Sequence, residues 1–307
     1  MSSNHYDPVV KTGGTINDFF LSCYFAWNNF WSLLTGKSHL ERILEQQGTH
    51  RASLISHVEW FLLKAGCVMI ESLPRADPED IFVRCAVSAQ GEHRSALKFR
   101  LSRYLSEMKT YNKLRDNVED RRREVFNPKN DEHVDKLKKL WELTLPDRID
   151  EFALVSKVWQ EIGYQGVDPS TDFRGMGMLS LDQLLYLGEN YPEQLKAIHQ
   201  ISHHPTIGFP MAVAGITITS FCHHMLRKGV LRKHFYNLSA SHRIDFIAYN
   251  NAYCRIFTLF CEYYKRSNPK SIMSFNEYRL KFEKAVHEFL DLDGADLSLL
   301  TVDTLCT

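Results

Sequence analysis

The stretch WQEIGYQGVDPSTDFRGMGMLSL, residues 159–181, separates two segments of helical character. Phe152, Val155, Trp159 and Ile162 follow one another at helical spacing, which predicts an amphipathic helix over 152–162. Gly163 and Gly166 then end this helix, because glycine adopts the backbone angles of a helix terminus at little cost. Asp168-Pro169 follows and favours extended or turn geometry. The stretch therefore predicts helix, loop and helix.

The loop carries a single cation, Arg174, directly before Gly175 and Gly177. Glycine has no Cβ, so we expect these positions to let a foreign surface approach the backbone closely. A good N-cap residue stands at each of three positions ahead of the second helix, Ser170, Thr171 and Asp172. Two interpretations of Arg174 follow. It meets an anion on a partner, or it pairs with Asp168 or Asp172 and locks the loop.

Composition excludes a general attraction to nucleic acid. The 307 residues contain 37 basic and 37 acidic side chains, so the formal net charge is zero. The densest basic run, Arg121-Arg122-Arg123, is bracketed by acidic residues and is predicted to be a solvated helix face, with nucleic-acid binding as a remote alternative.

Cysteine usage points to a reducing compartment. The chain has seven cysteines and no CxxC pair, and most of them stand among apolar residues, as do Cys67, Cys85, Cys254 and Cys261. We expect small core side chains and no disulfide framework. The first residues show neither a secretory leader nor a myristoylation start, so a cytoplasmic location is expected.

The N-terminal region combines a polar tail with an unusual apolar helix. Residues 1–15 are polar and are expected to be loosely held. Aromatic and aliphatic side chains recur at helical spacing over 16–34, and no charge appears between Phe19 and Leu34. Two interpretations stay open: an amphipathic helix at a membrane surface, or a helix packed on the protein's own core. The first places the protein peripherally on intracellular membranes.

Further helices are predicted on both sides of Asn127-Pro128, which we take as an internal boundary. Residues 54–69 form a buried helix, and Asp77-Pro78 starts another with its cap and first-turn proline. The spacing of apolar residues over 97–118 predicts a long helix, packed within the chain in preference to a coiled-coil dimer. After the boundary, helices are expected around 134–141, 181–187, 192–203 and 246–264.

Two segments of the second half need separate interpretation. Residues 215–219 alternate as a strand does, yet Pro210, the alanines and the length of 209–225 favour a buried helix. Near the end, Ser274 and Glu277 are predicted to form a capping box, with Met273 stapled to Tyr278. No βαβ pattern occurs. The fold class is therefore predicted to be all-α, as a single multi-helix domain with the N-terminal amphipathic helix.

Motifs for metal or nucleotide chemistry are weak. His199 and His203 have the i, i+4 spacing of two ligands on one helix face, but Gln200 stands where a metalloprotease needs glutamate. Gly175-x-Gly177 lacks both the lysine and the preceding strand of a phosphate loop. We expect no metal and no cofactor.

Several of these segments resemble one family. GYQGVDP, TDFRGMGML and the tryptophan four residues before Gly163 are similar to the signature of the ELMO domain, and SIMSFNEYRLKFEK near the end resembles its short members. The resemblance covers most of the chain. It implies a tail and apolar helix over 1–37, a helical region over 38–130, the ELMO domain over 131–294, and a C-terminal tail over 295–307.

The resemblance also implies a function. The short ELMO domain-containing proteins are GTPase-activating proteins for Arf and Arf-like GTPases, and the arginine that matches Arg174 is their proposed catalytic residue. The partner is then the GTP-bound GTPase. Residues implied to position the loop or meet the partner are Gln165, Asp168, Thr171, Asp172, Gly175, Met176 and Gly177. The alternative is a non-catalytic scaffold for Rac-type exchange factors, like the longer ELMO proteins, whose domains generally lack this arginine.

Overall fold

The computed structural model describes residues 14–46, 50–69, 75–239 and 243–306; the side chains of residues 14–18 and of Arg174 lie outside this description. Every regular element in the described ranges is helical, which confirms the all-α prediction. The predicted polar tail falls almost entirely outside the described residues.

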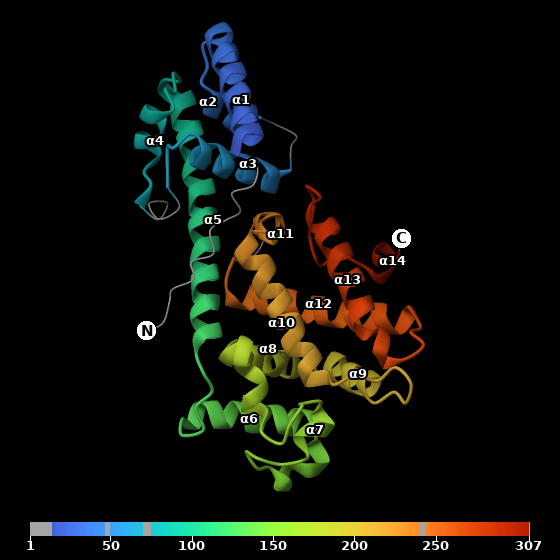
Figure 1. Ribbon diagram of the computed structural model, residues 1–307. Coiled ribbons are helices and arrows are strands. Elements are labelled where there is room, and N and C mark those ends of the chain that lie inside the picture. Colours follow the sequence, from blue (N-terminus) through green and yellow to red (C-terminus); the bar gives the residue numbers. More distant parts are fainter. Residues whose placement is uncertain (1–13, 47–49, 70–74, 240–242, 307) are drawn as a thin grey trace. The chain divides into compact units, whose positions relative to one another are not determined.

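The chain forms two compact units. Unit 1 comprises residues 1–49 and 57–105, and unit 2 comprises 50–56 and 106–307. The long helix α5, Gly91–Arg123, contributes to both and is drawn as one continuous rod in Figure 1. Asn127-Pro128 lies within unit 2, in the turn that follows α5. The domain limits at 130 and 294 stay predictions.

Unit 1 contains α1 (Gly14–Thr35), α2 (His39–Glu45), most of α3 (Arg51–Lys64), α4 (Pro78–Arg84) and the first half of α5. Asp77 caps α4 as predicted, because its carboxylate accepts the Glu79 N–H at 2.7 Å. The prediction of a helix to residue 69 is wrong. Gly66 adopts φ +68°, and the Cys67 N–H turns back to the Leu62 carbonyl at 3.0 Å.

Helix α1 packs on the rest of unit 1 through polar groups and through Phe25, whose ring centroid lies 6.5 Å from that of Phe61. The Tyr24 hydroxyl is hydrogen-bonded to His39, and Arg42 donates to the Asn28 side-chain oxygen at 3.2 Å. Asn28 is only 7% exposed, whereas Trp27 is 61% and Leu33 is 86% exposed. The helix therefore contacts its own unit on one side and leaves the aromatic side open.

Unit 2 is built around α8 (Gly177–Asn190), which lies among α6 (Asp131–Thr144), α9 (Pro192–Ser202), α10 (Met211–Lys228) and α12 (Phe246–Arg266), as Figure 1 shows. The remaining elements are η2 (Pro146–Glu151), α7 (Trp159–Ile162), η3 (Pro169–Gly175), α11 (Arg232–Leu238), η4 (Ile272–Ser274), α13 (Phe275–Leu290) and α14 (Val302–Leu305).

The second half of α5 packs within unit 2. The sequence predicted such packing within the chain in preference to a coiled-coil dimer. Met108, Tyr111, Leu114 and Val118 are all buried, and the Tyr111 hydroxyl donates to the Leu226 carbonyl at 2.8 Å. Its apolar stripe is thus used inside the chain.

The ambiguous segment 209–225 forms helix α10, which confirms the preferred interpretation. Gly215 matters for the packing of this helix, because a Cβ there would lie 2.6 Å from Leu184 and 3.0 Å from the Tyr253 hydroxyl. The glycine therefore lets α10 approach α8 and α12 closely.

Helix α13 begins directly after Ser274, where the sequence predicted it, but the predicted capping box is wrong. Ser274 makes no side-chain cap, because η4 draws it into helical angles of φ −83° and ψ −4°. Met273 is 88% exposed and staples nothing. After α13, Ala295, Leu297 and Leu300 are buried in unit 2, so the C-terminal segment is packed and not loose.

Candidate functional site

The segment before the loop is not the helix that its apolar spacing predicts. Helix α7 contains only Trp159–Ile162, and Val155 is 61% exposed. The Ser156 N–H instead donates to the Val167 carbonyl at 2.8 Å, which folds residues 152–158 back along the loop. Gly163 does end the helix as predicted, at φ +95°, and a Cβ there would lie 2.2 Å from the Met211 backbone nitrogen.

Asp168 caps the 3-10 helix η3 that carries Arg174. Its carboxylate accepts the Ser170 N–H at 2.9 Å and the Ser170 hydroxyl at 2.7 Å, and Pro169 takes the first helical position. The assignment of Ser170, Thr171 and Asp172 as caps is therefore wrong, because all three lie inside η3. The Thr171 hydroxyl instead stabilises η3 by donating to the Asp168 carbonyl at 2.8 Å.

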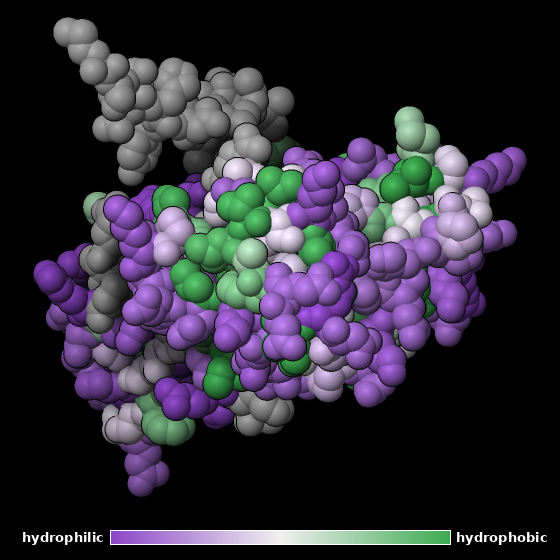
Figure 2. Space-filling model, turned by 90° about the horizontal axis from the view of Figure 1, so that it is seen from below, coloured by the Kyte–Doolittle hydropathy of each residue, from purple (hydrophilic) through white to green (hydrophobic). Residues whose placement is uncertain are grey.

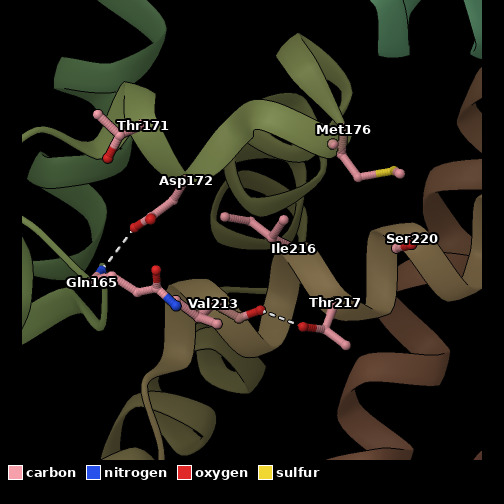
Figure 3. A pocket seen from close by; sticks show the side chains of 9 residues that line it. Gln165, Thr171, Asp172, Met176, Val213, Ile216, Thr217 and Ser220 are labelled. Atoms are coloured by element: carbon pink, nitrogen blue, oxygen red, sulfur yellow. Dashed lines mark hydrogen bonds between the residues drawn. The ribbon is translucent and has the colours of Figure 1, made fainter.

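Asp172 closes the loop onto its first residues. Its carboxylate accepts the Gln165 backbone N–H at 2.8 Å, the bond drawn in Figure 3. The Gln160 side-chain amide donates to the Gln165 carbonyl at 3.3 Å. Gln165 is thus held through its backbone, while its side chain extends toward α10.

Buried aromatic rings anchor the loop to the core of unit 2. Phe173 is 2% exposed and lies 6.0 Å from Tyr164 and 6.0 Å from Phe126, measured between ring centroids. Tyr164 contacts Trp159 at 5.5 Å, and Trp159 contacts Trp141 at 4.8 Å. Burial, together with the charge of Asp172, raises the pKa of Tyr164, so its hydroxyl stays neutral. Phe173, the residue directly before Arg174, is therefore held in the core.

The two glycines after Arg174 have different surroundings. A Cβ at Gly177 would lie 2.3 Å from the Arg122 carbonyl oxygen and 2.4 Å from that of Glu124, and the residue has φ +50°. Gly175 is exposed and has nothing within 4 Å of that position. The expectation that both permit foreign docking is thus wrong for Gly177, which admits the chain's own backbone.

The end of α5 holds the loop electrostatically. Arg122 donates to the Gly175 carbonyl at 3.0 Å and to the Glu119 carboxylate at 2.7 and 2.8 Å. Glu119 also bonds His223 of α10 at 2.7 Å. The Arg122 hydrogen bonds, followed by that of His223, lower the pKa of Glu119 to about 2 against the opposing effect of burial.

The interpretation of the basic run as a solvated face is wrong for two of its members. The side chains of Arg121 and Arg122 are 19% and 25% exposed, and Arg121 forms an ion pair with Asp182 of α8. Only Arg123 is largely exposed, at 68%. Sequence spacing reveals the acids nearby in the chain but not the carboxylate supplied by another helix.

A hollow of about 360 Å³ opens beside η3 (Figure 3). Five of its lining residues were predicted from the sequence, namely Gln165, Thr171, Asp172, Gly175 and Met176. The other four come from α10 and were missed, namely Val213, Ile216, Thr217 and Ser220. These four share the i, i+3, i+4, i+7 spacing of one helix face, a signal available once 209–225 is read as a helix.

The remaining predicted residues lie around this hollow in different roles. Asp168 caps η3, and Gly177 packs on the end of α5. Arg174 lies in η3 between the buried Phe173 and the exposed Gly175, and its side chain is outside the described part of the chain. The partnership of Arg174 with Asp168 or Asp172 therefore stays a prediction. Both carboxylates already accept backbone N–H groups.

Metal ligands gather at one place in the described ranges, where donor atoms of Glu41, Glu45 and His93 lie within 4.8 Å of one another. Glu45 already pairs with Lys37 at 2.8 Å, and Glu41 accepts the Ser88 N–H at 3.2 Å. These contacts with other protein groups account for the proximity of the three side chains in unit 1. The rings of His199 and His203 meet edge to face, 4.5 Å apart between centroids, and in the described chain they join no group of three donors.

The exposed side chains that lie close to the loop in the sequence include apolar ones. Figure 2 views the molecule from the side on which Figure 1 draws α6 and α7, and hydrophilic residues surround a smaller apolar area there. Three apolar side chains between α6 and η3 are exposed: Ile149, Val155 and Val167. For the described residues as a whole, no helix has the length and apolar character needed to span a bilayer.

The fold and the site together define an all-helical protein that presents an arginine-bearing surface loop, anchored by buried aromatic rings beside a hollow. The model of the ELMO/CED-12 family matches residues 116–279, just over half of the chain. The chain belongs to the ELMO/CED-12 family, and its full-length relatives are ELMO domain-containing proteins.

These relatives match along nearly their whole length. The chain is 31% identical to ELMO domain-containing protein 2 of Homo sapiens over 285 residues, which cover 89% of this chain and 94% of that protein. It is 30% identical to ELMO domain-containing protein B of Dictyostelium discoideum over 269 residues, covering 85% and 92%. The match to ELMO domain-containing protein 1 of Mus musculus is 30% over 306 residues, covering 91% and 92%.

Proposed function

We propose that this protein stimulates GTP hydrolysis by a small GTPase of the Arf or Arf-like family, with Arg174 acting in trans. The observation that carries the proposal is the hollow beside η3. Its rim joins the exposed backbone of Gly175 to polar groups of α10, directly next to Arg174 in the chain. A partner's surface can approach here without displacing core residues.

The chemistry suits an arginine on a fixed backbone. A GTP-bound GTPase supplies its own Mg²⁺ and phosphate loop, so a partner contributes mainly positive charge at the transferring phosphoryl group. A guanidinium stays charged and offers two parallel N–H donors to phosphate oxygens. Anchoring of Phe173 and capping by Asp168 reduce the entropy lost when the loop docks. In this proposal Asp172 and Thr171 orient the loop, and Gln165 and Met176 meet the partner.

Single-turnover hydrolysis across a panel of GTP-loaded Arf and Arf-like proteins tests the proposal. We expect acceleration of roughly 10³-fold or more for at least one member, with GDP release unchanged. GDP release should be followed in parallel for Rac-type GTPases. Faster GDP release without faster hydrolysis would favour the non-catalytic scaffold instead.

We also propose that α1 rests on a membrane surface, which would place an otherwise cytoplasmic protein peripherally on intracellular membranes. Three features support a lipid interface as the occupant of its exposed side. This side carries Trp27, Phe30 and Trp31, aromatic rings of the kind that favour the headgroup region. It lacks charge between Phe19 and Leu34, and the polar groups Tyr24 and Asn28 face unit 1 instead.

Liposome flotation tests this second proposal. The wild-type protein should float with phosphatidylcholine vesicles, and a Trp27→Ser, Trp31→Ser variant should remain in the soluble fraction. Tyr278→Ser on α13 is the control for loss of an aromatic ring, and it should float normally. Equal flotation of the α1 variant and wild type would exclude the interface. Deletion of residues 16–34 must in addition leave a folded protein, because loss of folding would assign the helix to the core.

A further inference from the structure

Two thiols of unit 1 lie in contact although 18 residues separate them in the sequence. The sulfur atoms of Cys67 and Cys85 are 3.1 Å apart. Since a disulfide bond measures about 2.05 Å, an approach of roughly 1 Å would join them. Cys67 is 8% exposed and Cys85 is half-buried, so a small oxidant can reach the pair from the Cys85 side.

Backbone structure fixes this contact. Cys67 follows the end of α3, where its N–H and that of Val68 both donate to the Leu62 carbonyl at 3.0 and 3.2 Å. Cys85 is the C-cap of α4, and its N–H donates to the Ile81 carbonyl at 2.9 Å. The Arg84 guanidinium bridges the two segments by donating to the Cys67 carbonyl at 3.2 Å.

The environment distinguishes this pair from the other buried cysteines. The hydrogen bond from Cys85 is the main cause that lowers the pKa of Cys67 to about 7, with support from the Arg84 charge against burial. The pKa of Cys85 is raised by the same contact. Cys254 shows the opposite behaviour to Cys67, since burial raises its pKa to about 12. Only a thiolate is a good nucleophile, so we assign Cys67, whose carbonyl accepts the hydrogen bond from the Arg84 guanidinium, as the attacking thiol.

We propose that Cys67 and Cys85 form a reversible redox site that reacts with hydroperoxides. The Cys67 thiolate attacks the distal peroxide oxygen; an S–O bond forms, the O–O bond breaks, and the leaving alkoxide takes a proton to become an alcohol. Cys85 then attacks the Cys67 sulfur, the S–S bond forms, and water leaves with the Cys85 proton. The dithiol loses two electrons and the hydroperoxide gains them.

The product would tie α4 to the end of α3. The disulfide closes a loop that contains all of α4, so it restricts the unfolded chain as well as the folded unit. Reduction by two thiols of a small dithiol restores the starting state. The proposal does not rest on the proposed GTPase activation, since both cysteines belong to unit 1 and the residues of the hollow belong to unit 2.

The test uses the full chain with Cys23→Ser and Cys306→Ser, since these two exposed thiols would otherwise consume oxidant. Hydrogen peroxide is added in small excess, and free thiols and non-reduced peptides are measured by mass spectrometry. We expect two of the five remaining thiols to disappear, a Cys67–Cys85 peptide lighter by about 2 Da, and full recovery with dithiothreitol. The oxidised protein should melt roughly 5 °C higher.

Single variants separate the steps. With Cys85→Ser, a sulfenic acid should accumulate at Cys67 and react with dimedone, whereas Cys67→Ser should trap none at Cys85. Cys254→Ser is the matched control and should leave the reaction unchanged. A disulfide between other cysteines, or equal oxidation of all five thiols, would overturn the proposal. If a variant fails to fold, the oxidised chain with native Cys67 and Cys85 decides: a disulfide between them supports the site, and its absence excludes the site.

Discussion

The Arg174 loop and helix α1 use their aromatic residues in opposite ways. In the loop, Phe173 and Tyr164 are turned inward and the polar backbone is turned outward. In α1, Tyr24 and Asn28 face unit 1 through hydrogen bonds, and most of the phenylalanine and tryptophan side chains are exposed. One surface is therefore polar and anchored, and the other is apolar and uncovered.

This difference indicates two kinds of partner. A polar loop fixed by a buried ring loses little entropy on docking and suits a directional contact with a charged group. An apolar face suits a non-directional contact whose strength follows the area removed from water. The two surfaces should therefore respond differently to substitution, with the larger effects at the loop.

Arg174→Lys and Arg174→Ala give the largest expected change. Lysine keeps the charge but loses the two-pronged donor, so we expect it to lose most of the stimulated hydrolysis, and alanine to lose roughly 10³-fold or more. Both variants should still bind the GTP-loaded partner, because the residue acts chiefly in the transition state. Single-turnover kinetics and a separate binding assay measure the two properties.

Arg266→Lys is a suitable control for these variants. Arg266 is a surface arginine of unit 2 that pairs with Asp303, and its replacement should leave hydrolysis unchanged. A structural ion pair at Arg174 predicts a different pattern, in which the alanine variant loses melting temperature and partner binding together. Full stimulation by a well-folded Arg174→Lys protein would exclude the arginine finger.

Gly177→Ala should destabilise the protein by about 3 kcal/mol, because the new Cβ meets two carbonyl oxygens of α5 and the backbone has positive φ. Gly175→Ala is the matched control and should change stability by less than about 0.5 kcal/mol, since open space surrounds it. Denaturant unfolding measures both. Equal costs would contradict the division between an inward and an outward glycine.

Glu119→Gln should cost about 2 kcal/mol at pH 7, because Arg122 and His223 lose their charged partner. The folded-state pKa of Glu119 is about 2, below its unfolded value, so its contribution is present above about pH 4.5 and is lost as the pH falls toward 2. The difference between wild type and variant should therefore shrink over this acid range. A constant difference from pH 7 to 2.5 would show that charge is not the cause.

The smallest effect is expected on the open side of α1. Trp27→Ser and Leu33→Ser should change the free energy of unfolding by less than about 0.5 kcal/mol, since both side chains are exposed. Asn28→Ala, one position along from Trp27, should cost about 1 kcal/mol because it removes the bond from Arg42. Thermal unfolding in the absence of lipid compares them. A larger loss for Trp27→Ser would assign the aromatic side to the core.

Local patterns predicted the elements well where chain neighbours decide the outcome. Asp77-Pro78 starts α4, Gly163 ends α7, and apolar spacing gives α5, α8 and α12. The predictions that were wrong depend on distant groups. Ser274 makes no side-chain cap because η4 precedes α13 directly, and Arg121 forms an ion pair with Asp182 of another helix.

Five of the nine residues lining the hollow were predicted from the sequence, because the segment that resembles the ELMO domain signature is continuous in the sequence. The four from α10 were not, since their place depends on how α10 packs beside η3. The contact between Cys67 and Cys85 was missed for the same reason: each cysteine reads as a small apolar side chain, and only the folding of α3 and α4 joins their sulfurs.

Local sequence patterns predicted that the protein is helical, where several of its helices begin or end, and that Arg174 stands on a loop directly before Gly175 and Gly177. Backbone preferences and apolar periodicity act over a few residues, so the sequence shows them directly. Only the tertiary structure decided that Gly177 faces the protein and Gly175 faces outward, and that α1 buries its polar side. Whether a side is buried depends on which distant segment covers it, and no local pattern contains that information.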